Sequence, residues 1–117
     1  MINISFGVAK QNLELLKNII DEASGYGIWS VFYGEEEIES VNNLRIKADK
    51  IYNESLTETK GSFTLELSFK EAQVLKKVII FYLTNNFKNL RRREFETISD
   101  FILFVDDSLA FELEDKL

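Results

Sequence analysis

The side chains available for catalysis are carboxylates, lysines, tyrosines and hydroxyls, because the 117 residues include no histidine and no cysteine. Without histidine the commonest general base and metal ligand is missing. Without cysteine there is no thiolate nucleophile, disulfide or cysteine-bound zinc. Carboxylates alone could act on a glycosidic bond or hold Mg²⁺, and Glu66 with Asp100 or Asp106 would be such a pair, but no spacing demands it. We therefore expect a protein that is not an enzyme and needs no cofactor or metal.

A basic cluster consists of Lys88, Arg91, Arg92 and Arg93, four cations within six residues. Guanidinium groups bind oxyanions through paired hydrogen bonds, so the cluster could clamp a phosphate or a carboxylate. The other interpretation is a solvated junction between two helices, where cations hydrogen-bond the last carbonyls of the first helix. The net charge of −6 disfavours nonspecific nucleic-acid binding by the surface as a whole.

Two acidic clusters are candidates for metal coordination or for docking a basic partner. The first contains Glu35, Glu36 and Glu37, and its other interpretation is the acidic first turn of a helix. The second is the tail, which is either a binding surface or simply solvated. No calcium-loop spacing is present in either cluster. The acidic residues of the tail are Asp106, Asp107, Glu112, Glu114 and Asp115.

The glycine-fenced segment 25–34 combines three glycines with aromatic residues. Its glycine spacing matches neither the dinucleotide fingerprint nor the P-loop. Tyrosine and tryptophan often anchor protein interfaces, although a strand that carries them is more often part of the core. We take Tyr26 and Tyr33 as candidate partner-binding residues and expect Trp29 in the core.

Three segments have the pattern of strands: 28–33, 44–49 and 63–67. The first is rich in β-branched and aromatic residues, and the third alternates apolar and polar residues. The second, 44–49, also alternates, but Val41, Leu44 and Ala48 equally fit helical spacing, and a helix here would permit a βαβ unit. We favour the strand. Upstream, the alternation of Ile2, Ile4 and Phe6 indicates a short strand or an ordered arm.

Apolar residues at three- and four-residue steps predict helices over 8–23, 69–85 and 94–113. Ser68 and Glu71 have the spacing of a capping box, which places the start of the second helix. This helix is apolar nearly all round, so we expect it at the centre of the fold. Within the third, 101–105 could instead be a strand. The prediction is an α+β fold in a single domain, 1–117, with a small antiparallel sheet packed against about three helices.

No signal-peptide pattern opens the chain, and the longest apolar run, Val78–Leu83, is only six residues. With the lack of cysteine, these features predict a cytoplasmic protein with no membrane partner. The abundance of Ile, Asn, Lys and Phe is typical of AT-rich coding sequence, so we expect a low-GC bacterium or a mobile element as the source.

The leading hypothesis is a non-enzymatic protein-binding module, such as an inhibitor, an immunity factor or a regulator, that acts by steric and electrostatic complementarity. The alternative is a nucleic-acid-associated regulator that uses Lys88 and Arg91–Arg93 to contact RNA or DNA. A third hypothesis is a structural component that assembles as a homo-oligomer.

Overall fold

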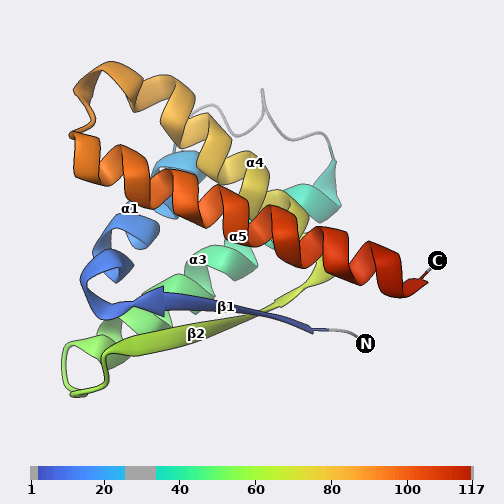
Figure 1. The fold of residues 1–117 in the computed structure, drawn as a ribbon, viewed down its shortest axis with the longest axis horizontal. Coiled ribbons are helices and arrows are strands. Elements are labelled where there is room, and N and C mark those ends of the chain that lie inside the picture. Colours follow the sequence, from blue (N-terminus) through green and yellow to red (C-terminus); the bar gives the residue numbers. More distant parts are fainter. Residues whose placement is uncertain (1–2, 26–33, 117) are drawn as a thin grey trace.

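The computed structural model of the chain describes residues 3–25 and 34–116. The expected strand 28–33, with Tyr26, Trp29 and Tyr33, lies outside the described residues. Within them, four α-helices accompany a two-stranded antiparallel sheet (Figure 1). The elements in chain order are β1 (Asn3–Ala9), a 3-10 turn (Lys10–Asn12), α1 (Leu13–Gly25), α3 (Glu35–Ser55), β2 (Ser62–Ser68), α4 (Phe69–Asn86), a second 3-10 turn (Phe87–Asn89) and α5 (Arg92–Lys116).

The α+β expectation is confirmed in its coarse form, although the described part is mostly helical and has four helices where about three were expected. The strand expected at 63–67 is β2, and the helices expected at 69–85 and 94–113 are α4 and α5. The suggestion that 101–105 forms a strand is therefore wrong, because α5 is continuous through it.

The strand expected at 44–49 is wrong, because this segment lies inside α3. Its alternation of apolar and polar residues is coincidental. Leu44 and Ala48 are buried with Val41, which is helical spacing, whereas Ile46 is 60% exposed on the opposite side of the helix. A helix buries positions three and four apart, so burial follows the helical stripe that the sequence also contained.

The helix expected over 8–23 begins too early, because Val8 and Ala9 belong to β1 and α1 begins at Leu13. Ile4, Phe6 and Val8 are all buried and continue one strand alternation. They lie opposite Leu67, Leu65 and Phe63 of β2. The upstream alternation in the sequence therefore marks a true strand, one that runs farther than its first residues suggested.

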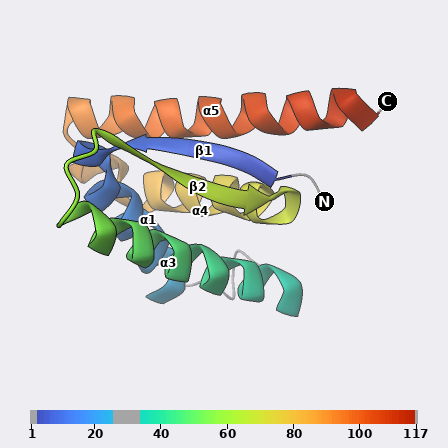
Figure 2. The ribbon, with the colours of Figure 1, turned by 90° about the horizontal axis from the view of Figure 1, so that it is seen from below.

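The centre of the fold is α4, as its apolar composition predicted. It contacts α1, α3, α5 and both strands, and its buried apolar side chains lie on more than one side of the helix. The strands lie between α5 and α3 (Figure 2). Alternate side chains of each strand enter the core, so one face of the sheet is buried and the other is exposed. The buried apolar residues of α4 are Ala72, Val74, Leu75, Val78 and Ile79.

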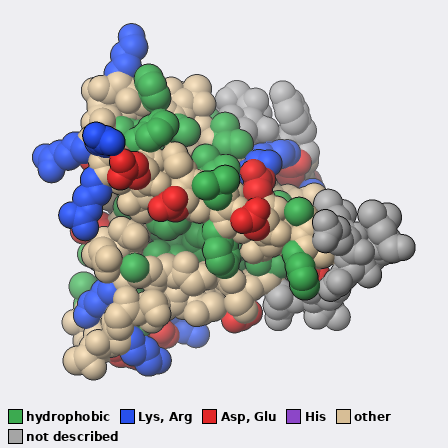
Figure 3. Space-filling view, viewed as in Figure 1, with side chains coloured by type: hydrophobic (Ala, Val, Ile, Leu, Met, Phe, Trp, Pro, Cys, Tyr) green, Lys and Arg blue, Asp and Glu red, His purple; other side chains and the backbone are tan. Residues whose placement is uncertain are grey.

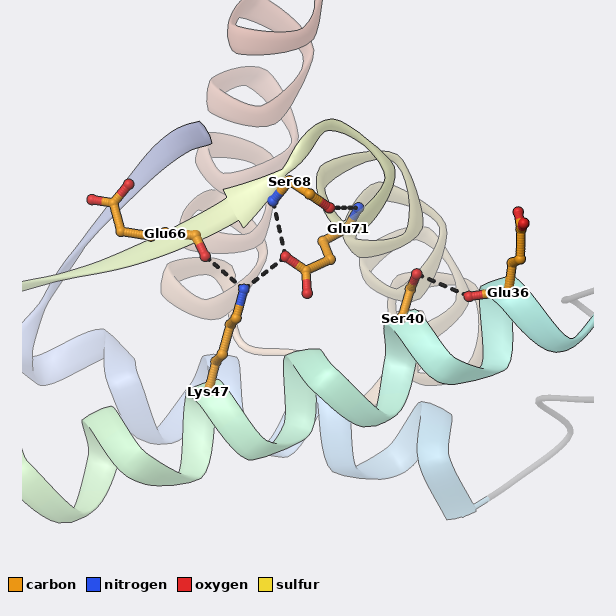
Figure 4. Close-up of polar contacts among 6 residues, drawn as sticks. All are labelled: Glu36, Ser40, Lys47, Glu66, Ser68 and Glu71. Carbon is orange, nitrogen blue, oxygen red and sulfur yellow. Dashed lines mark hydrogen bonds and ion pairs between the residues drawn. The ribbon is translucent and has the colours of Figure 1, made fainter. Parts of the chain in front are cut away.

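The capping box predicted at the start of α4 is confirmed. The Glu71 amide donates to Ser68 Oγ at 3.0 Å, and the Ser68 amide donates to Glu71 Oε1 at 2.9 Å (Figure 4). These two bonds satisfy amide groups that the first turn of a helix leaves without partners. The box therefore determines where β2 ends and α4 begins.

Replacing Ser68 with alanine removes the acceptor for the Glu71 amide. We expect the free energy of unfolding to fall by about 1 kcal/mol, the usual cost of a lost N-cap. Urea denaturation followed by circular dichroism measures it. Ser62→Ala is the control, because Ser62 is exposed at the start of β2 and its side chain has no hydrogen bond to the described residues. Equal losses in the two variants would show that the cap contributes nothing.

Candidate protein-binding surface

The register of the sheet decides which backbone groups point out of it. Lys10 N donates to Gly61 O at 2.9 Å, and these residues lie opposite each other one step beyond the last ladder pair. Hydrogen-bonded and non-hydrogen-bonded pairs alternate in an antiparallel ladder. The backbone N–H and C=O groups of Ser5 and Gly7 therefore point away from β2, and those of Glu66 point away from β1.

The outer edge of β2 is covered by α3. Lys47 Nζ donates to the outward-pointing Glu66 carbonyl at 2.8 Å and to Glu71 Oε1 at 2.7 Å (Figure 4). The same ammonium group thus occupies an acceptor of the strand edge and ties α3 to the capping box of α4. A lysine placed in this way blocks further strand pairing.

The outer edge of β1 is open. Ser5 and Gly7 are exposed, and a Cβ added to Gly7 would meet no atom within 4 Å. Among the described residues, no group hydrogen-bonds to the outward-pointing backbone of Ser5 or Gly7. The sheet therefore has one edge, that of β2, packed by α3 and bonded by Lys47, and one edge, that of β1, whose outward groups at Ser5 and Gly7 have no hydrogen-bond partner among the described residues.

A groove of about 420 Å³ lies between β1 and the C-terminal half of α5. In Figure 3, hydrophobic side chains lie over α5 and in the hollow between α5 and β1. The buried ring of Phe6 packs edge-to-face on Phe104, with ring centroids 5.1 Å apart. Phe104 is nevertheless 42% exposed, and Phe111 is 62% exposed. The groove is lined by Ile4, Ser5, Phe104, Asp107, Ser108, Phe111 and Glu112.

The carboxylates of this groove have no cationic partners among the described residues. Asp106, which faces α4, pairs with Lys76 at 2.6 Å, but no described lysine or arginine pairs with Asp107 or Glu112. The Oε2 atom of Glu112 is buried without a hydrogen bond. The groove therefore combines exposed aromatic rings with carboxylates that have no ion-pair partner in the described part of the chain. Of the acidic tail, Glu114 and Asp115 lie in α5.

The basic cluster lies where α4 turns into α5, at the left of Figure 1. Lys88, Arg91, Arg92 and Arg93 are all exposed. They do not bond the last carbonyls of α4 as the junction interpretation expected. The side-chain amides of Asn85 and Asn86 instead donate to carbonyls one turn back within α4, Phe81 O and Tyr82 O, both at 3.0 Å.

Acidic groups reduce the positive field at this corner. Arg92 Nε bonds Glu96 Oε1 at 3.1 Å, and Glu94 accepts a bond from the Arg91 amide at 3.4 Å. Burial raises the pKa of Tyr82, and the charges of Glu22 and Glu94 raise it further. Of the four cations, Arg92 is therefore paired with a carboxylate and Arg91 lies next to one, and the role of the cluster in binding stays a prediction.

Glu35, Glu36 and Glu37 form the first turn of α3, where negative charge stabilises a helix N-terminus. Glu37 pairs with Lys77 at 3.0 Å, whereas Glu35 and Glu36 are exposed. This turn and the basic cluster lie at opposite ends of the molecule in Figures 1 and 2. The structure therefore does not bring the acidic and basic clusters into one site.

Sequence reasoning missed the groove. It treated Phe104 only as part of an apolar helix face, and it did not consider Phe111 or Gly7. Two signals were present. A glycine between the apolar residues of a strand often marks the close approach of another backbone, and α5 carries more phenylalanines than one buried stripe requires.

No protein-family model, curated protein or solved structure matches this chain. In the described residues, no helix is long and apolar enough to cross a membrane. The same part of the chain holds no group of three or more carboxylates arranged to bind a metal ion. The function is therefore inferred from the surface of the described residues.

Replacing Lys47 with methionine keeps the apolar stem but leaves the buried Glu71 without its ion-pair partner. We expect the free energy of unfolding to fall by about 1 to 2 kcal/mol, less than for a fully buried pair because the lysine side chain is 39% exposed. Urea denaturation measures the change. Lys50→Met, an exposed neighbour on α3, is the control. A loss no greater than the control's would contradict the structural role of Lys47.

Proposed function

We propose that this chain is a non-enzymatic protein-binding module that docks a partner in the groove between β1 and α5. The observation that carries the proposal is the exposure of Phe104 and Phe111 beside the open edge of β1. Exposed apolar surface in contact with water is unfavourable, and its burial against a partner supplies binding free energy. Inhibitors, immunity factors and regulators act through such surfaces without catalysis.

The composition of the groove favours a protein over a nucleic acid as its occupant. Rigid aromatic anchors bordered by polar groups are typical of protein interfaces. The carboxylates of Asp107 and Glu112, which pair with no cation of residues 3–25 and 34–112, would repel a phosphate backbone, which proteins neutralise with lysine and arginine. They would instead attract a partner that carries positive charge.

Phe111→Ser and Phe87→Ser form a matched pair, because both phenylalanines are 62% exposed and they lie toward opposite ends of α5. With the full chain immobilised in a lysate of its source organism, we expect wild type and Phe87→Ser to retain the same protein. Phe111→Ser should weaken binding about thirtyfold, the effect of losing one interface anchor. Titration with the purified partner measures the affinity.

Retention of no protein by the wild-type chain would contradict this function. So would equal retention by wild type and Phe111→Ser. Circular dichroism and urea denaturation of both serine variants provide the folding control, because both side chains are mostly exposed and their loss should leave the core unchanged.

A second candidate function, binding of single-stranded nucleic acid, is favoured by one observation. The rings of Phe87 and Phe95 lie edge-to-face with centroids 6.1 Å apart and are exposed beside the basic cluster. Aromatic rings next to cations can stack bases while the cations contact phosphates. The neighbouring Glu94 and Glu96 weaken this candidate, because they offset half of the four positive charges.

The triple variant Arg91→Ala, Arg92→Ala, Arg93→Ala tests this second candidate. If it is correct, a labelled single-stranded oligonucleotide binds the wild-type chain at low salt, and the affinity falls steeply as salt increases. The triple variant should then lose at least tenfold in affinity, since about 1.4 kcal/mol corresponds to tenfold. Fluorescence anisotropy measures both. Absence of binding at low salt would eliminate the candidate.

A further inference from the structure

We propose that the partner docks by adding an extended strand to the outer edge of β1, and that this strand alternates apolar residues with lysine or arginine. The inference rests on the proposed protein-binding function and specifies its geometry and the chemistry of its occupant. Three independent features support it: the difference between the two sheet edges, the position of the aromatic groove, and the charge around it.

The backbone provides the first argument. The β1 edge offers the N–H and C=O groups of Ser5 and Gly7 to solvent, whereas Lys47 covers the corresponding edge of β2. An open strand edge is a template for pairing, and proteins that do not use one usually block it. Because one edge of this sheet is blocked and the other is open, the structure assigns strand pairing to β1. Peptide recognition by strand addition takes its affinity from such main-chain bonds.

The groove provides the second argument. Alternate side chains of a strand added beside β1 would face either the α5 side or the outer face of the sheet, because strands have a two-residue period. On the α5 side they would meet Phe104 and Phe111, which favours apolar residues. On the outer face they would join Ser5 and Glu66, whose side chains bond each other at 2.9 Å. That face favours polar or basic residues.

Charge provides the third argument and distinguishes a foreign strand from a second copy of this chain. Asp107 and Glu112 in the groove have no cationic partner among the described residues, and the chain carries a net charge of −6. A twofold dimer through β1 would bring the same carboxylates and the same net charge together on both sides. Lysine or arginine on an incoming strand removes that repulsion, because its positive charge opposes the net negative charge and, on the outer face, lies on the side of the Glu66 carboxylate.

The test uses a fluorescein-labelled heptapeptide of alternating composition, Lys-Val-Lys-Phe-Lys-Val-Lys, and the full chain. We expect binding by fluorescence anisotropy, and at least tenfold weaker binding when glutamate replaces every lysine. Two further peptides carry N-methyl groups on alternate residues, one on the odd and one on the even positions. Only one of these should bind like the parent, because a paired strand turns every second N–H toward its neighbour.

Gly7→Pro is the matching change in the protein, with Gly7→Ala as its control. The proline removes an N–H that points away from β2, so the ladder with β2 keeps its bonds. A Cβ atom at this position meets no other atom within 4 Å, so the alanine fits without a clash. We expect Gly7→Ala to bind the heptapeptide like wild type and Gly7→Pro to bind it at least about tenfold more weakly, as one lost bond and a blocked approach require.

Equal binding by the two N-methylated peptides, or no binding at about 1 mM parent peptide, the limit of weak specific contacts, overturns strand addition. If Phe111→Ser loses the natural partner but the peptide tests contradict strand addition, the groove remains the docking site and only the proposed mode of binding is wrong. If Phe111→Ser has no effect on the partner, the proposed function itself fails. If light scattering shows that the wild-type chain is a dimer and that Gly7→Pro is a monomer, the occupant of the β1 edge is a second copy of this chain and not a foreign strand. If Gly7→Pro does not fold, the N-methylated pair decides alone.

Discussion

The burial of α4 is the constraint on which the rest of the structure depends. A helix with apolar side chains nearly all round is stable only when neighbours cover it on each side, and α1, α3, α5 and the buried face of the sheet provide that cover. The capping box fixes where α4 begins, and Lys47 ties the box to α3. With its helices engaged in this way, the described part of the chain leaves the outer face of the sheet and one edge in water.

The sequence predicted the elements whose signals are local. The alternation at 63–67 and the Ser68–Glu71 box lie within a few residues of the structures they specify, and both predictions were confirmed. The segment 44–49 contained two compatible patterns, and local alternation could not decide between them. The helix α3 packs against α1 and α4, and these contacts join residues that are far apart in the sequence. They bury the residues with helical spacing and not the alternating ones.

The candidate site was harder to predict for the same reason. Charge clusters are visible in a sequence because their members are neighbours, and Lys88 with the three arginines was found in this way. The groove joins Ile4 near the start of the chain to Phe111 near its end. Which edge of the sheet stays unpaired depends on which strand pairs with which, and the blocking of the β2 edge depends on Lys47 reaching it from another element. No local pattern carries that information.

The contact between Lys47 and the Glu66 carbonyl also limits how many edges of the sheet can pair with another strand. A molecule with two open sheet edges can act as a bifunctional monomer, so that each pairing event creates a site for the next and polymerisation continues into fibrils. With Lys47 bonded to the β2 edge, the sheet of the described residues has one edge, that of β1, left for pairing. A strand that pairs with the β1 edge therefore leaves no second edge of this sheet for a further strand. The protein can then expose a strand edge and phenylalanine side chains without forming fibrils through this sheet.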